Sequence, residues 1–258
     1  MKKFLRISFH LIKINIEKDL IYSFNTWFLL FTTFFYSVTF LLSLKFVFMQ
    51  VDSILGYSFE QLAILTLGGQ LFWYVHVVFV RKSMQNLADL IHEGKLDMML
   101  VKPVSMRRII PFLEFDQRHV LPSILASGVI AYFLRSYDLS VIQIIGIIGF
   151  FINGMIISFF ITLIFVTFTF WSGRNDAVFN ILMSLVDILR LPMSFFPGFL
   201  KPLFFVIPAI PILNPSLQII NGRVDTWLII VSLLITSVLF IIAEFMWRLG
   251  LKNYTSAN

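Results

Sequence analysis

The chain has 258 residues, of which 59% are hydrophobic and only 13% are charged, and its mean hydropathy is +0.90. Soluble domains carry about 25% charged residues, and 31 Phe side chains would leave wide apolar patches on a water-facing globule. A soluble enzyme, a disordered chain and a nucleic-acid-binding module are therefore excluded, and the lack of Cys excludes disulfides and thiol chemistry. The composition predicts an all-α polytopic membrane protein that forms one transmembrane domain over residues 1–258.

Six apolar stretches follow one another along the chain, most of them near the roughly 20 residues that a helix needs to cross a bilayer. They are Trp27 to Met49, Gln61 to Val80, His119 to Leu134, Val141 to Phe170, a stretch from about Val178 into Pro192, and Trp227 to Trp247. We therefore expect spans one and two in 27–80, spans three to five in 119–191 and span six in 227–247. Five or seven spans are the alternatives, because the stretch after Pro192 is ambiguous.

The basic residues predict the orientation. With the N-terminus inside, 15 of the 20 Lys and Arg fall in the segments expected to be cytoplasmic, which are 1–26, 81–118, 171–177 and 248–258. An excess of Lys and Arg marks the cytoplasmic side of a membrane protein. Both termini are therefore expected in the cytoplasm.

The segment before the first span is amphipathic. Phe4, Ile7, Leu11 and Ile14 recur at helical spacing, and basic side chains occupy most of the opposite stripe. This pattern favours a helix within 1–26 that lies in the membrane interface and carries force from a cytoplasmic partner to the first span. The alternative is a basic tail that only sets the orientation.

The segment 81–118 is the longest polar stretch, and it contains an apolar element too short to span. Gly94 follows a helical face as the expected C-cap, and the Met-containing run after it suits docking into a groove. We predict a coupling helix that inserts into a partner subunit; a helix resting on lipid headgroups is the alternative. The residues assigned to this contact are Leu87, Ile91, Gly94, Leu96, Asp97, Met98, Met99, Lys102 and Pro103.

Six of the nine prolines lie between residues 192 and 215, separated by apolar side chains. Proline removes a backbone donor and resists helix continuation, so no complete span fits here, yet the stretch is too apolar for water. We expect a re-entrant hairpin in 192–226 that caps an outward gate; an interfacial loop with aromatic anchors is the alternative. The residues assigned to the gate are Pro192, Phe196, Pro197, Pro208 and Pro215.

A few polar residues lie inside or at the ends of the predicted spans, where ionisable groups are costly. Asp187 and Arg190 share a helix face and are expected to pair, with a substrate or gating contact as the alternative. His76 is expected to be buried and hydrogen-bonded, and Glu244 and Arg248 are expected to form an ion pair. Small residues on the fourth span, including Gly146 and Gly149, predict close helix packing.

Three separated pieces together resemble one family. Gly94-Lys95-Leu96-Asp97 through Lys102-Pro103, the prolines from Pro192 to Pro215, and the run Trp247-x-x-Gly250-x-x-x-Tyr254-x-Ser256 are similar, in this order, to motifs of the six-span type-two ABC exporter permeases. The resemblance implies the transmembrane subunit of an ATP-driven exporter in a bacterial or archaeal cytoplasmic membrane. It also implies two cytoplasmic ABC ATPase subunits and a second permease, identical or homologous, as partners.

The chain lacks the G-x-x-x-x-G-K-[ST] phosphate-binding loop. We therefore expect no catalytic residue, cofactor or metal on this chain, and ATP and Mg on the partner ATPase. No nucleic-acid partner is expected; membrane lipids are. The alternative functions are a secondary transporter, a non-transport assembly subunit and, less favoured, a lipid-modifying membrane enzyme.

Overall fold

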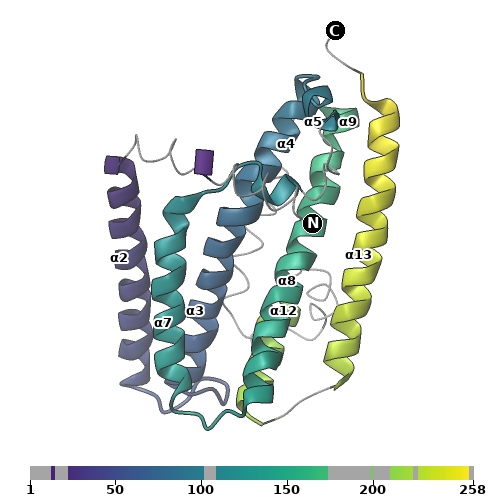
Figure 1. Cartoon of the computed structure of the whole chain (residues 1–258). Helices are drawn as coiled ribbons and strands as arrows, with labels where there is room; N and C mark the ends of the chain where they lie inside the picture. Colours follow the sequence, from purple (N-terminus) through teal and green to yellow (C-terminus); the bar gives the residue numbers. More distant parts are fainter. Residues whose placement is uncertain are drawn as a thin grey trace.

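The computed structural model describes residues 13–14, 23–101, 109–173, 199, 210–222 and 226–255. Every regular element of these ranges is helical, as predicted, and the long helices run side by side (Figure 1). The helices are α2 (Ser23–Phe48), α3 (Phe59–His76), α4 (Lys82–His92), α5 (Asp97–Leu100), α7 (Val120–Leu134), α8 (Val141–Thr167), α9 (Thr169–Ser172), α12 (Ile210–Ile220) and α13 (Thr226–Asn253). A π-helical turn η1 (Val77–Arg81) joins α3 to α4, and two 3-10 turns, η2 (Ile110–Phe112) and η3 (Gln117–His119), precede α7.

Four helical stretches in the described part of the chain are long and apolar enough to cross a membrane. They are Trp27–Phe48, Phe59–His92, Val141–Ser172 and Thr226–Asn253, which correspond to predicted spans one, two, four and six. The third predicted span forms α7, whose 15 residues are about 22 Å long, less than the roughly 30 Å hydrocarbon core. The fifth predicted span and most of the predicted N-terminal interfacial helix lie outside the described residues, so six spans stay a prediction.

The helix of the second predicted span continues into the predicted polar segment. The polar segment was expected to begin at residue 81, but the helix continues without interruption from Phe59 to His92, over 34 residues. At 1.5 Å per residue this helix is about 51 Å long, so its α4 part extends beyond a bilayer core. Arg81 and Lys82 lie inside this helical stretch, so the change from apolar to charged side chains does not end the helix.

One end of the molecule therefore extends past α2 and α7. It holds α4, α5, α9 and the last turns of α13 (Figure 1), and we call it the α5 end. At the opposite end, two long helices begin with capping boxes. The Ser58 side chain accepts a hydrogen bond from the amide of Gln61 at the start of α3, and the Ser140 side chain accepts one from the amide of Gln143 at the start of α8. Each Gln side chain in turn accepts a hydrogen bond from the backbone N–H of its Ser.

The helices form two packed groups, one around α3 and the other around α8. α3 packs on α7, and α8 packs on α12 and α13. The small residues of α8 contribute unevenly: a Cβ on Gly146 would lie 3.2 Å from Ile219 of α12, whereas Gly149 has open space beside it. In the same region the Thr236 hydroxyl donates to Asn153 Oδ1 at 2.9 Å, joining α13 to α8. Gly154 and Ser158 of the same predicted face are buried as well, so close packing on the small-residue face is confirmed except at Gly149, which is exposed.

Candidate functional site

The predicted coupling segment begins where α4 ends, and its turn has a defined hydrogen-bond pattern. The amide of Gly94 donates to Ile91 O at 3.2 Å and that of Lys95 donates to Leu90 O at 2.9 Å, which is the Schellman arrangement. Gly94 has φ +66°, a left-handed conformation that glycine adopts without steric cost. The prediction of Gly94 as the helix-ending residue is therefore confirmed.

The segment divides into a buried base and an exposed edge. Leu87, Ile91 and Leu96 are buried, and Leu96 has no exposed surface. They belong to one apolar cluster that also contains Leu163 of α8 and Trp247 of α13. These three residues were predicted to contact a partner subunit, but they are covered by their own chain, so they support the segment from below.

The exposed edge follows at the end of α5. Asp97 and Met99 are half-buried, Leu100 is exposed, and Val101 is 82% exposed although it is apolar. Of the other residues assigned to the contact, Lys102, Pro103 and the side chain of Met98 lie outside the described residues. An apolar edge at the tip of the extended end is available to another protein.

A buried carboxylate, which the sequence analysis did not single out, fixes the part of the chain just before α7. Asp116 accepts two bonds from the Arg118 guanidinium, at 2.8 Å from Nε and 2.7 Å from Nη2, and its Oδ2 lies 3.3 Å from Lys82 Nζ. His119 Nδ1 is 3.6 Å from the same oxygen. Burial raises the pKa of Asp116, but the three basic neighbours lower it by more, so the pKa lies well below its ordinary value of 3.8.

Further bonds attach this loop to the helix that ends in the coupling segment. The amide of Asp116 donates to Val78 O at 3.3 Å, within the π-helical turn. The Ser83 hydroxyl donates to Glu114 O at 3.0 Å and accepts the amide of Glu114 at 3.1 Å. The loop and the first turns of α4 therefore form one unit, assembled from residues more than 30 positions apart.

Comparison with protein families identifies the family to which the chain belongs. The sequence matches the family described as "ABC-2 family transporter protein" over residues 34–258, which is most of the chain. The chain belongs to the ABC-2 transporter family. Searches among curated proteins and among solved structures each give no match.

Membership in the ABC-2 family confirms the resemblance drawn from the sequence motifs and makes the chain a multi-pass membrane protein of the transport-permease type. The matched range contains the whole coupling segment, the Asp116 loop and the last span. The N-terminal amphipathic segment lies before it.

Two of the predictions for polar residues in the spans of this ABC-2 permease can be compared with its structure. Glu244 and Arg248 form the expected ion pair, with Arg248 Nε 2.6 Å from Glu244 Oε1. His76 is fully buried as expected, and neither ring nitrogen has a hydrogen-bond partner in the described part of the chain, so the expected hydrogen bond stays a prediction. Its ring stacks on Phe72, with centroids 6.3 Å apart.

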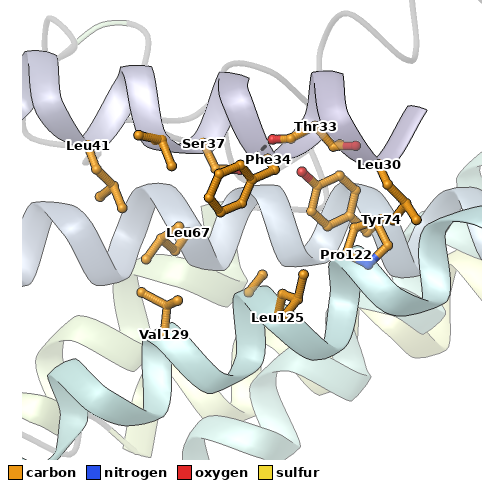
Figure 2. Close-up of a pocket in the computed structure, with 12 residues that line it drawn as sticks. Leu30, Thr33, Phe34, Ser37, Leu41, Leu67, Tyr74, Pro122, Leu125 and Val129 are labelled. Atoms are coloured by element: carbon orange, nitrogen blue, oxygen red, sulfur yellow. Dashed lines mark hydrogen bonds between the residues drawn. The ribbon is translucent and has the colours of Figure 1, made fainter. Parts of the chain in front are cut away.

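An apolar groove lies between α2, α3 and α7 of the permease, and Thr33, Ser37 and Tyr74 are the polar residues of its lining (Figure 2). Gln70 donates to Ser37 Oγ at 2.7 Å and to the Tyr74 hydroxyl, and Ser37 donates to Thr33 O at 2.8 Å. The rest of the wall is aliphatic or aromatic, including Leu30, Leu41, Leu67, Leu125 and Val129. Among described residues the structure shows no group of acidic or His side chains arranged to hold a metal.

The predicted gate lies almost entirely outside the described residues. Pro192, Phe196, Pro197 and Pro208 fall there, as do Asp187 and Arg190. Pro215 is buried within the short helix α12, which packs on α8 and α3. A helix of 11 residues before the last span is too short to cross a membrane, and the re-entrant gate stays a prediction.

Proposed function

We propose that this ABC-2 chain is the permease subunit of an ATP-driven exporter whose ATP is hydrolysed on a separate subunit. The observation that carries the proposal is the exposed apolar edge at Leu100 and Val101, at the tip of the extended α5 end. Family membership supports a transport permease, and permeases of this family pair with a cytoplasmic ATPase. The edge is the natural point of contact for that ATPase.

The docking face differs from the one drawn from the sequence alone. Asp97, Met99, Leu100 and Val101 would enter a groove of the ATPase, with Met99 adapting its shape. The buried Leu96 holds this short helix onto the core of the permease. A displacement of the docked edge would therefore pass into α4, α8 and α13, because the apolar cluster under the segment contains residues of all three helices.

The mechanism that follows is alternating access. ATP binding closes two ATPase subunits, and the coupling segments of two permeases, identical or homologous, move with them. A pathway then opens at the permease–permease interface beneath the proline-rich outer region. The free energy comes from ATP on the partner, so this chain binds no cofactor and does no covalent chemistry. In this proposal the termini are cytoplasmic and the membrane is that of a bacterium or archaeon.

The proposal is tested by purifying the tagged chain from native membranes in mild detergent. We expect an ATPase with a phosphate-binding loop to co-purify, in equal stoichiometry with the permease. After reconstitution into nanodiscs the complex should hydrolyse ATP, and orthovanadate should inhibit it. If no ATPase accompanies the chain from native membranes or after co-expression with its neighbouring reading frames, the exporter function is refuted.

A further inference from the structure

The end of the last span contacts the coupling segment through one side chain. The hydroxyl of Tyr254, which follows α13, accepts the backbone N–H of Leu96 at 2.9 Å. The two residues are 158 positions apart in the chain. The contact therefore joins the turn between α4 and α5 to the end of the last span.

The Leu96 amide needs this partner. The amides of Gly94 and Lys95 donate back into α4, and the bonds of α5 begin with the Met99 amide, which donates to Leu96 O. Leu96 lies between the two helices with a buried side chain, and its bond to Tyr254 is part-buried. The Tyr254 hydroxyl supplies the acceptor that neither helix provides.

A second contact fixes the direction of Tyr254. Trp247, Gly250 and Tyr254 lie at i, i+3 and i+7, on one face of the helical spacing. The ring of Phe170 in α9 packs against this face, with its centroid 5.8 Å from that of Trp247 and 6.1 Å from that of Tyr254. A Cβ on Gly250 would overlap the Phe170 ring, so only glycine allows the approach.

The hydrogen bond lies beside a polar cavity. The cavity has a volume of about 320 Å³, and its lining includes His92, Glu93, Asn253 and Thr255. Aqueous access on one side means that the bond competes with water, and a neutral hydrogen bond then contributes only about 1 kcal/mol. The packing against Phe170 holds the Tyr254 ring in place, while the Tyr254 hydroxyl positions the turn between α4 and α5 through Leu96.

We propose that Tyr254 is a positioning residue that ties the coupling segment to α13, so that residues 93–101 and the last span move as one body. The terminal Trp247, Gly250 and Tyr254 pattern then has one mechanical role: it seats Phe170 and aims the Tyr254 hydroxyl at Leu96. The tie gives the partner ATPase a direct route to the last span, in addition to the route through the apolar core. The proposal rests on the exporter function for its role in transport, but the tie itself can be measured on this chain alone.

The first experiment uses Tyr254→Phe, which keeps the ring against Phe170 and removes only the hydroxyl. Hydrogen–deuterium exchange of the purified permease in nanodiscs should show the Leu96 amide exchanging about fivefold faster, the factor that corresponds to one neutral hydrogen bond. Tyr132→Phe is the matched control, because Tyr132 is an exposed tyrosine on α7 and its loss should leave Leu96 unchanged. Equal exchange at Leu96 in Tyr254→Phe and wild type overturns the tie.

The second experiment measures common movement. The chain has no Cys, so cysteines introduced at the exposed Lys95 and Lys252 can carry spin labels without background. In the reconstituted complex, the label-to-label distance of the wild type should be the same without nucleotide and with a non-hydrolysable ATP analogue. In Tyr254→Phe it should differ between the two states. A wild-type distance that changes with nucleotide, or a variant distance that does not, overturns the common movement. If no ATPase associates with the wild type, the exporter function fails while the exchange result still decides the tie.

Discussion

Asp116 and Arg118 form a bidentate ion pair in which each carboxylate oxygen accepts a hydrogen bond from a guanidinium nitrogen, at 2.8 and 2.7 Å. The Asp116 side chain is 2% exposed and that of Arg118 is 23% exposed. Lys82 of α4 approaches the same carboxylate from the long helix. The contact with Lys82 therefore anchors the loop before α7 to the helix that leads into the coupling segment.

Replacing Asp116 with Asn should destabilise the permease by about 2 kcal/mol, because the substitution leaves Lys82 and Arg118 close together without a countercharge. Thermal unfolding in detergent measures the change. Glu93→Gln is the control, since the Glu93–Lys95 pair is more than half exposed on both sides and exposed pairs contribute less than about 1 kcal/mol. Equal melting temperatures for the two variants would contradict the anchoring role.

The Asp116 cluster also predicts how stability changes with pH. The pKa of Asp116 is lowered in the folded chain, so the folded state favours the ionised carboxylate more than the unfolded state does. This contribution is fully present above the unfolded pKa of about 3.9 and is lost as the pH falls below it. The difference in unfolding temperature between the wild type and Asp116→Asn should thus be constant from pH 7 to about pH 5 and shrink towards pH 3. A difference that grows on acidification would show the opposite linkage.

The sequence predicts the long helices well because their signal is local. Apolar runs mark the membrane-crossing stretches, Gly94 marks the end of α4, and the spacing of Glu244 and Arg248 marks their ion pair. The charge at Arg81 marks the start of the polar segment in the sequence, but it does not show that one helix continues through it to His92. The composition of a segment indicates whether lipid or water surrounds it, and one helix can extend from lipid into water.

The features that sequence reasoning missed are tertiary. Asp116 contacts Lys82 from a separate element more than 30 positions away, and no spacing rule brings these two residues together. Leu96 and Val101 are both apolar residues of one short run, but one is fully buried and the other is exposed. A helix of four residues, such as α5, has too few turns for periodicity to show which face is covered.

This difference between Leu96 and Val101 gives a direct test of the docking face. Val101→Asp should leave the permease folded, because Val101 is exposed, and should abolish co-purification of the ATPase by placing a charge in an apolar contact. Leu96→Asp should instead reduce the amount of folded permease, because it buries a carboxylate without a partner. Size-exclusion chromatography and the permease-to-ATPase ratio on an affinity resin separate the two effects.

Val141→Asp is the matched control for Val101→Asp. Val141 is 74% exposed and begins α8 at the end opposite α5. An Asp in the first turn of a helix is tolerated, and this end should not contact the ATPase, so association should stay at the wild-type level. The docking face is refuted if Val101→Asp retains as much ATPase as Val141→Asp.

Gly250 and Gly149 both lie within long helices, and they predict opposite effects of the same substitution. Gly250→Ala should destabilise the permease by about 2 kcal/mol, because the new methyl overlaps the Phe170 ring, which Trp247 and Tyr254 confine on either side. Gly149→Ala meets open space, so stability should be unchanged or rise by up to about 1 kcal/mol from the higher helix propensity of Ala. Thermal unfolding in detergent compares the two. Phe170→Leu should recover part of the loss in Gly250→Ala by withdrawing the ring, and a double variant no more stable than Gly250→Ala alone would locate the strain elsewhere.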